Sequence, residues 1–274
     1  MINGLVSNCW NWQLNNGESL VDLIQQAQNR GLNYVELRQH SLGEFESDGI
    51  PIQDRFQELG RQFSSFDFDL AIAVPFLNPT VVLSELSLLA TSLEACIQLA
   101  ANGKPHLRLV DLSTSEADSR SLNPGDCAKS IANTAELLSR HDGILSIEHS
   151  IQSWNLFRST FDAARELLSS RNVDPTVLRI CFDPCNLLLL KEEHLDPAQV
   201  TRTLSSDELS MIHFKQRIDG APSNGLTDGE IDWAQVESAI NERNLNVPWL
   251  LEIPSTEQIW EHVEQSQQYL HRLR

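Results

Sequence analysis

Short apolar segments recur along this chain and alternate with longer segments in which apolar residues return with the period of an α-helix. The short segments are rich in Val, Ile and Leu, which is typical of parallel strands that are buried on both faces. Eight such strands are predicted, at residues 4–9, 33–37, 70–74, 107–112, 144–148, 178–183, 211–214 and 249–253.

Helices are predicted between these strands, at residues 19–30, from Pro51, at 81–101, from Pro124, at 161–168, from Trp233 and at 258–270. Regular alternation of strand and helix predicts a parallel sheet. Eight repeats within 274 residues fit an α/β protein of the (β/α)8 TIM-barrel class, which typically uses about 250 residues. We expect residues 1–274 to form a single domain with this fold.

The formal net charge of −18 limits the classes of partner that the protein is expected to bind. An acidic surface repels phosphate backbones, and Lys and Arg are scattered, so nucleic acid is not expected as a partner. No apolar run reaches the roughly 18 residues of a membrane span, and the first residues do not resemble a secretory signal. The five cysteines are odd in number and irregularly spaced, which argues against a disulfide framework. We therefore expect a cytoplasmic protein without a membrane contact.

Four of the predicted strands in the second half of the chain carry, at or one residue before their carboxyl end, a residue type that binds metals. These residues are Glu148, Asp183, His213 and Glu252, and the intervals between them are 35, 30 and 39 residues. A βαβ unit takes roughly 30 or more residues, so each interval is one unit. Because the carboxyl ends of barrel strands meet at one face, the four side chains are expected to converge there. Three carboxylates and one imidazole suit Mn²⁺, Mg²⁺, Co²⁺ or Zn²⁺.

The same part of the chain resembles the xylose isomerase-like TIM-barrel superfamily, which includes sugar isomerases and epimerases, inosose and dehydroshikimate dehydratases, and endonuclease IV-type repair enzymes. The resemblance covers the whole chain by strand order, and its specific motifs lie between residues 144 and 254. The matching segments are Ile147-Glu148, Phe182-Asp183-Pro184-Cys185-Asn186-Leu187, His213-Phe214-Lys215, Gly229-Glu230-Ile231-Asp232-Trp233 and Leu251-Glu252-Ile253.

The resemblance implies that Glu148, Asp183, His213 and Glu252 hold one divalent metal ion. In related epimerases, the glutamates of strands five and eight remove a proton from one face of the substrate and return it to the other. Lys215 lies two residues after His213 and therefore points to the same side of the strand. It is a candidate to neutralise a developing oxyanion or to hold a substrate oxygen.

Further residues near the predicted barrel mouth are candidates for substrate binding. Aromatic walls can pack on the C–H face of a sugar, and Trp10, Trp12 and Trp154 follow strands one and five. Asn186 occupies a position where many members of the superfamily carry His. The remaining candidates are His149, which follows Glu148 by one position, and Arg217 after strand seven.

Other polar residues have structural interpretations. Glu36 and Arg38 are expected to form an ion pair inside the barrel mouth. Asp111 is expected to be a structural hydrogen-bond acceptor, and Asp232 is expected to cap the helix that begins at Trp233. The glycine-rich loop 216–229 is a candidate lid.

These observations favour a divalent-metal-dependent isomerase or epimerase that acts on a small sugar or polyol derivative by proton transfer through an enediolate. A metal-dependent dehydratase of the inosose or dehydroshikimate type is an alternative, because it shares the first proton abstraction. A non-catalytic sugar-binding barrel is a second alternative, because Asn186 replaces the common His. A homo-oligomer is compatible with the sequence.

Overall fold

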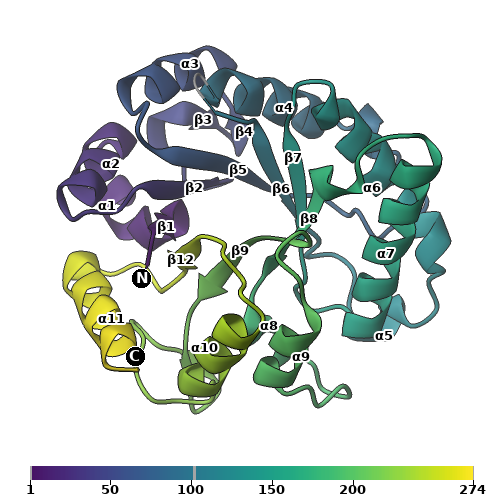
Figure 1. Ribbon diagram of the computed structural model, residues 1–274. Helices are drawn as coiled ribbons and strands as arrows, with labels where there is room; N and C mark the ends of the chain where they lie inside the picture. Colours follow the sequence, from purple (N-terminus) through teal and green to yellow (C-terminus); the bar gives the residue numbers. More distant parts are fainter. Residues whose placement is uncertain (1, 101–102, 274) are drawn as a thin grey trace.

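The computed structural model describes residues 2–100 and 103–273 and contains a closed barrel of eight parallel strands (Figure 1). The order around the barrel is β1, β12, β9, β8, β7, β6, β5 and β2. Each barrel strand therefore lies beside the barrel strand that follows it in the chain. The last strand, β12, lies beside the first, β1, which closes the barrel as in a (β/α)8 TIM barrel. The strands are β1 (Gly4–Val6), β2 (Tyr34–Arg38), β5 (Asp67–Ala73), β6 (His106–Val110), β7 (Ile144–Glu148), β8 (Leu178–Phe182), β9 (Leu209–Phe214) and β12 (Trp249–Leu251).

Helices surround the barrel and cover the outward faces of the strands. The longer ones are α2 (Leu20–Asn29), α3 (Gln53–Gln62), α4 (Ser87–Leu99), α6 (Pro124–Ser139), α7 (Trp154–Ser170), α9 (Pro197–Thr203), α10 (Trp233–Glu242) and α11 (Ile259–Leu273). Short helices lie in the loops: α1 (Asn11–Asn15), α5 (Glu116–Ser119), α8 (Pro184–Leu187), η1 (Ser7–Trp10), η2 (Gly43–Phe45), η3 (Leu83–Glu85) and η4 (Pro175–Val177). Two small hairpins complete the chain: β3 (Glu46–Ser47) with β4 (Ile50–Pro51), and β10 (Arg217–Ile218) with β11 (Ala221–Pro222).

Three helix starts differ from the sequence prediction. The helix predicted at 161–168 begins already at Trp154, and two further helices begin later than predicted. Pro51 does not begin a helix, because it pairs with Glu46 in the β3–β4 hairpin, and the turn of that hairpin is made by Asp48 and Gly49 at positive φ. The helix predicted at 81–101 begins only at Ser87, since the preceding residues form η3 and an extended residue. Its predicted end at Ala101 lies outside the described residues.

The barrel interior is divided into an apolar and a polar zone. Val6, Tyr34, Cys181, Met211 and Leu250 form a small buried cluster of their own, separate from the large core between strands and helices. Charged side chains such as Glu36 and Arg108 occupy the interior beside this cluster and are completely buried. Buried charges require partners, so this polar zone is where a functional site is expected.

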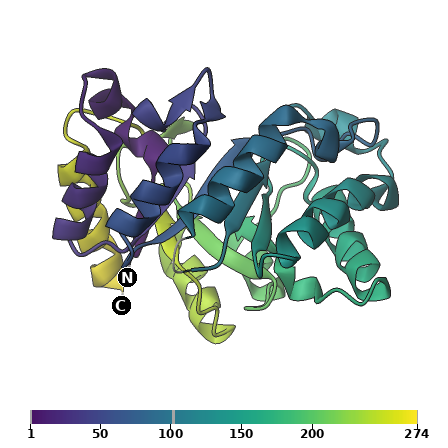
Figure 2. The same cartoon turned by 90° about the horizontal axis from the view of Figure 1, so that it is seen from above.

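The barrel closes where the first and last helices meet. In both ribbon views, α2 lies beside α11 (Figures 1 and 2). The Trp10 ring packs on the Trp260 ring with 5.8 Å between centroids, and the Arg30 guanidinium lies 4.4 Å from the Trp260 ring centroid. This contact joins the N-terminal and C-terminal parts of the chain and supports the pairing of β1 with β12.

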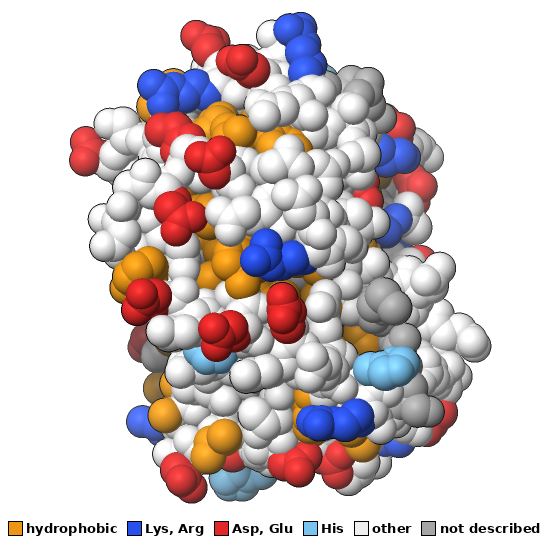
Figure 3. Space-filling view, turned by 90° about the vertical axis from the view of Figure 1, so that its left-hand side faces the viewer, with side chains coloured by type: hydrophobic (Ala, Val, Ile, Leu, Met, Phe, Trp, Pro, Cys, Tyr) orange, Lys and Arg blue, Asp and Glu red, His pale blue; other side chains and the backbone are white. Residues whose placement is uncertain are grey.

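The surface agrees with the charge pattern of the sequence. On the face drawn in Figure 3, Lys and Arg side chains are separated from one another by acidic and uncharged ones. This face therefore offers no continuous basic stripe for a phosphate backbone. Within the described residues, no helix has the length and apolar character that crossing a membrane requires.

Candidate metal centre

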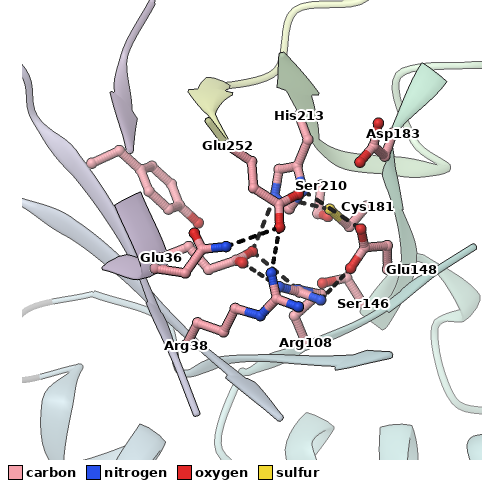
Figure 4. A network of polar contacts seen from close by, with 12 residues as sticks. Glu36, Arg38, Arg108, Ser146, Glu148, Cys181, Asp183, Ser210, His213 and Glu252 are labelled. Atoms are coloured by element: carbon pink, nitrogen blue, oxygen red, sulfur yellow. Dashed lines mark hydrogen bonds and ion pairs between the residues drawn. The ribbon is translucent and has the colours of Figure 1, made fainter. Parts of the chain in front are cut away.

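Glu148, Asp183, His213 and Glu252 meet at the carboxyl ends of their strands. One potential ligand atom from each residue lies within 4.8 Å of the others. An ion with ligand bonds of about 2.1 Å separates its ligand atoms by about 3 to 4 Å, so only a small contraction is needed. Figure 4 shows Glu252 and His213 side by side, with Glu148 facing them across the barrel. The structure therefore brings together the four residues that the strand spacing selected.

His213 presents one free ring nitrogen to this cluster. Its Nε2 lies 3.2 Å from Glu36 Oε2 and 3.4 Å from Cys181 Sγ. Its Nδ1 is buried without a hydrogen-bond partner and lies 3.6 Å from Glu148 Oε1 and 3.3 Å from Glu252 Oε2. Metal-binding histidines characteristically have their second nitrogen bonded to a carboxylate. The donor set and the free Nδ1 therefore fit a divalent cation.

Asp183 has two roles in the structure. Its Oδ1 accepts a hydrogen bond of 2.8 Å from Cys185 N and caps α8. Its Oδ2 lies 2.5 Å from Lys215 Nζ, which is also 3.2 Å from Glu252 Oε2. Capping thus orients the carboxylate without using the oxygen that faces the cluster. The Lys215 ammonium stands at the edge of the cluster, as its spacing from His213 predicted.

Each glutamate of the cluster turns its other oxygen toward an arginine (Figure 4). Arg108 bonds Glu148 Oε2 and also forms two bonds to Glu36, while Arg38 bonds Glu252 Oε1. The expected ion pair between Glu36 and Arg38 is therefore wrong. Both side chains point inward, but Arg108 reaches Glu36 across the intervening strand β5 and leaves Arg38 for Glu252.

These contacts divide the carboxyl groups of the cluster into two kinds. Burial opposes ionisation of Glu148, but Arg108 and His213 outweigh it, so the pKa of Glu148 is lowered. Burial opposes ionisation of Glu252 as well, and Lys215, His213 and Arg38 hold its pKa well below the usual range. Burial dominates at Asp183 and raises its pKa despite the neighbouring Lys215. The two glutamates are therefore ionised and available as ligands near neutral pH.

Three residues predicted to bind substrate lie elsewhere. Trp10 is fully buried against Trp260, and Trp154 is buried in a stack with Phe157 at 5.5 Å between centroids. His149 is also buried, and its Nε2 bonds Gln152 O at 2.7 Å. Burial lowers the pKa of His149 to about 4, so the ring is neutral. None of these three side chains is accessible to a ligand, and we correct their predicted role to packing.

Asn186 does lie at the cluster, because its Nδ2 donates to Glu148 Oε1 at 3.3 Å and to His149 O at 2.8 Å. Trp12 is 38% exposed and can contact a ligand.

The side chain of Arg217 contacts Gly220 and Glu230 in its own loop. That loop is fastened at its base, and the candidate lid is therefore anchored rather than free along its length. The anchor is the buried Gln216 amide, which bonds Thr227, Ile231 and Arg217.

Two structural interpretations are confirmed. Asp111 accepts hydrogen bonds from the backbone of Leu77 and Thr114. Asp232 caps α10 by accepting from Gln235 N at 3.1 Å.

Sequence reasoning did not find Arg108 or Asn8. Arg108 is the only charged residue in the strand segment His106–Val110, which is buried throughout. A permanent charge inside a buried strand is a signal that could have been used, because such a charge needs a partner. Asn8 donates to Glu252 Oε1 at 3.3 Å from the turn after β1, and nothing in its sequence context marks it.

Comparison with known proteins adds independent observations. The sequence model of the family described as xylose isomerase-like TIM barrel matches residues 24–273. No curated protein sequence matches this chain significantly. Among solved structures, the D-allulose 3-epimerase from Methylomonas sp. in complex with D-allulose has a TM-score of 0.66 at 12% identity, covering 99% of this chain and 96% of that one.

Two further solved structures show the breadth of the similarity. The probable 3-DHS dehydratase AsbF from Bacillus anthracis has a TM-score of 0.66 at 16% identity and covers 99% of both chains. The IolI protein, solved with a bound zinc atom, has a TM-score of 0.65 at 15% identity over 100% of this chain and 96% of that one. At such identities these structures establish the shared fold. Because the family model matches nearly all of the sequence, the chain belongs to the xylose isomerase-like TIM-barrel family.

Proposed function

We propose that this protein is a divalent-metal-dependent isomerase or epimerase of a small sugar or sugar derivative. The observation that carries the proposal is the order of the four candidate ligands around the barrel. Along β12, β9, β8 and β7 they are Glu252, His213, Asp183 and Glu148. The two glutamates thus flank the other ligands, as two bases must if they act on opposite faces of one substrate carbon.

A bound divalent cation would polarise a substrate carbonyl or hydroxyl and stabilise negative charge on its oxygens. Glu148, Asp183, His213 and Glu252 would hold it. The chain's own groups supply the proton transfer. One glutamate, ionised, accepts a proton from the carbon beside the carbonyl, and the other, after taking a proton from water, donates it to the opposite face of that carbon. The first glutamate then releases its proton to water before the next turnover. Lys215, cationic between Asp183 and Glu252, donates to the substrate oxygen that gains charge.

The two glutamates differ in how deeply their charged partners are buried. The Glu148 side chain is 6% exposed and is bonded to Arg108, which is itself fully buried. The Glu252 side chain is 10% exposed and is bonded to Arg38 and Lys215, which are both partly exposed. We therefore assign Glu252, whose charged partners are partly exposed, to the abstraction of the proton, and Glu148, whose arginine is fully buried, to the opposite face of the substrate carbon.

Exchange of a substrate C–H hydrogen with deuterium from heavy water tests the proposal. The Mn²⁺-loaded protein is incubated with a panel of ketoses and ketoacids, and the products are followed by NMR and mass spectrometry. Glu148→Gln and Glu252→Gln are each expected to lower the exchange rate by about 10²- to 10⁴-fold. Glu58→Gln, at an exposed position of α3, is the matched control.

Full exchange in both site variants contradicts the proposed mechanism. A product that has lost water identifies the dehydratase alternative, since isomerisation and epimerisation leave the mass unchanged. Tight metal and sugar binding without exchange or turnover identifies the non-catalytic alternative.

A further inference from the structure

A hollow of about 280 Å³ opens beside the candidate metal centre. It is lined by the ends of β2, β5 and β6 and by the turn after β1, including Asn8, Asn11, Arg38, Ser41 and Arg108. Among the described residues that line it, none is an Asp or Glu. In a chain with a net charge of −18, this lining presents two arginines and no carboxylate, and the carboxylates that pair with them, Glu36, Glu148 and Glu252, lie outside the lining.

The two arginines differ in what they can bind. The Arg108 side chain is fully buried, and its donors are engaged by Glu36 and Glu148. The Arg38 side chain is 27% exposed. Within the described part of the chain, its guanidinium contacts only Glu252, through Nη1. Its Nε and Nη2 donors remain for a ligand, and Arg38 lines the hollow.

Arg38 also stands at the boundary between the hollow and the metal centre. Glu252 Oε1 accepts hydrogen bonds from Arg38 and Asn8. The other oxygen, Glu252 Oε2, lies 3.3 Å from His213 Nδ1 and 3.2 Å from Lys215 Nζ. One carboxylate therefore connects the two places. Asn8 and Asn11 line this hollow and also a second one of about 320 Å³ that contains Lys215 and Glu252. A small molecule at the metal centre can thus extend toward Arg38.

We propose that the substrate carries a carboxylate, which Arg38 binds while the reacting carbons lie at the metal centre. The substrate class is then a sugar acid or keto acid rather than a neutral sugar. This inference rests on the proposed function for the identity of the reacting end. A guanidinium presents two parallel N–H donors that match a planar carboxylate. A phosphate dianion would leave charge unmatched, because Arg38 is the one permanent cation exposed in the described lining of the hollow.

The test compares acids with neutral sugars of the same skeleton. Glucuronate and glucose, galacturonate and galactose, and 2-keto-gluconate and fructose are titrated against the Mn²⁺-loaded protein by calorimetry and thermal shift. At least one acid is expected to bind more tightly than its neutral partner. Its dissociation constant is expected to rise by about 10- to 100-fold in Arg38→Gln, as for the loss of hydrogen bonds to a charged group. The dissociation constant of the neutral partner is expected to change less, through the lost contact between Arg38 and Glu252 alone.

Two variants make the result specific. Arg61→Gln removes an exposed arginine of α3 and is expected to change nothing. Arg38→Lys keeps the positive charge but removes the two parallel N–H donors of the guanidinium, so an intermediate loss of acid binding is expected. This variant also tests the inference if Arg38→Gln does not fold. If no acid binds better than its neutral partner, or if Arg38→Gln and Arg38→Lys bind the acid like the unmodified protein, the inference is wrong.

A separate Mn²⁺ titration distinguishes this failure from failure of the proposed function. Binding of Mn²⁺ without preference for acids overturns the Arg38 inference and leaves the metal centre intact. Preference for acids without any Mn²⁺ binding overturns the proposed function and leaves Arg38 as an anion-binding residue.

Discussion

Replacing Arg108 tests whether the buried ion pairs of the barrel interior hold the candidate site together. Arg108→Met keeps most of the side-chain volume and removes the charge. Glu36 and Glu148 then lose their shared cation while their side chains are 0% and 6% exposed. Breaking a buried pair by removing one partner costs about 3–5 kcal/mol, because a charge is left without compensation. Most variants at exposed ion pairs cost far less, about 0–1 kcal/mol.

The free energy of unfolding is measured by urea titration of the metal-free protein. The control is Arg202→Met, which removes an exposed pair with Glu242 at 2.8 Å. A double variant, Arg108→Met with Glu36→Gln, removes one of the stranded charges together with the arginine. Its destabilisation is expected to be smaller than the sum of the two single changes by about 1–3 kcal/mol.

Two results would refute the reasoning. A loss below about 1 kcal/mol in Arg108→Met would mean that solvent reaches the glutamates and compensates their charge. Strict additivity in the double variant would mean that Arg108 and Glu36 do not interact.

Three further predictions follow from the structure. Burial lowers the pKa of His106 to about 4, whereas the same side chain in the unfolded protein has a pKa near 6.5. The free energy of unfolding in urea should therefore be about 3 kcal/mol lower at pH 4 than at pH 7 through this group, and His106→Gln should reduce that difference. Lys215→Met should lower the deuterium exchange rate about 10²- to 10³-fold, and an unchanged rate would remove Lys215 from the mechanism. In Gly229→Ala, the new Cβ would lie 2.6 Å from Gln216 Cδ and from Arg217 O, so a lower melting temperature is expected, corresponding to about 1–3 kcal/mol.

The barrel fold and the convergence of four side chains could both be predicted from the sequence, because both depend on the length of the strand–helix repeat. A strand end every 30 to 39 residues places Glu148, Asp183, His213 and Glu252 on one face regardless of how the loops fold. The role of these residues as ligands and bases stays a prediction. It depends on an ion and a substrate as well as on geometry.

The errors come from local periodicity. Trp10 and Trp12 were both expected at the barrel mouth because they follow the first strand, but residues Ser7–Trp10 and Asn11–Asn15 are helical. Side chains two positions apart in a helix point in nearly opposite directions, so Trp10 enters the core and Trp12 remains at the surface. His149 follows the inward-facing Glu148, and adjacent residues of an extended segment face opposite ways.

The partners of the arginines could not be read from spacing. Glu36 is two residues from Arg38, yet it bonds Arg108, which is 72 residues away along the chain. Which carboxylate reaches which guanidinium depends on strand stagger and on side-chain length inside the barrel. Neither quantity has a period that the sequence reveals.

The contact between Trp10 and Trp260 has a consequence for how the protein is made. During synthesis, β1 leaves the ribosome long before β12, its neighbour in the finished barrel. The contact of Trp10 with Trp260 therefore cannot form until the last helix is made. Because the indole emission changes as its surroundings become apolar, the fluorescence of Trp10 should report the final step of maturation, when an open sheet becomes a ring.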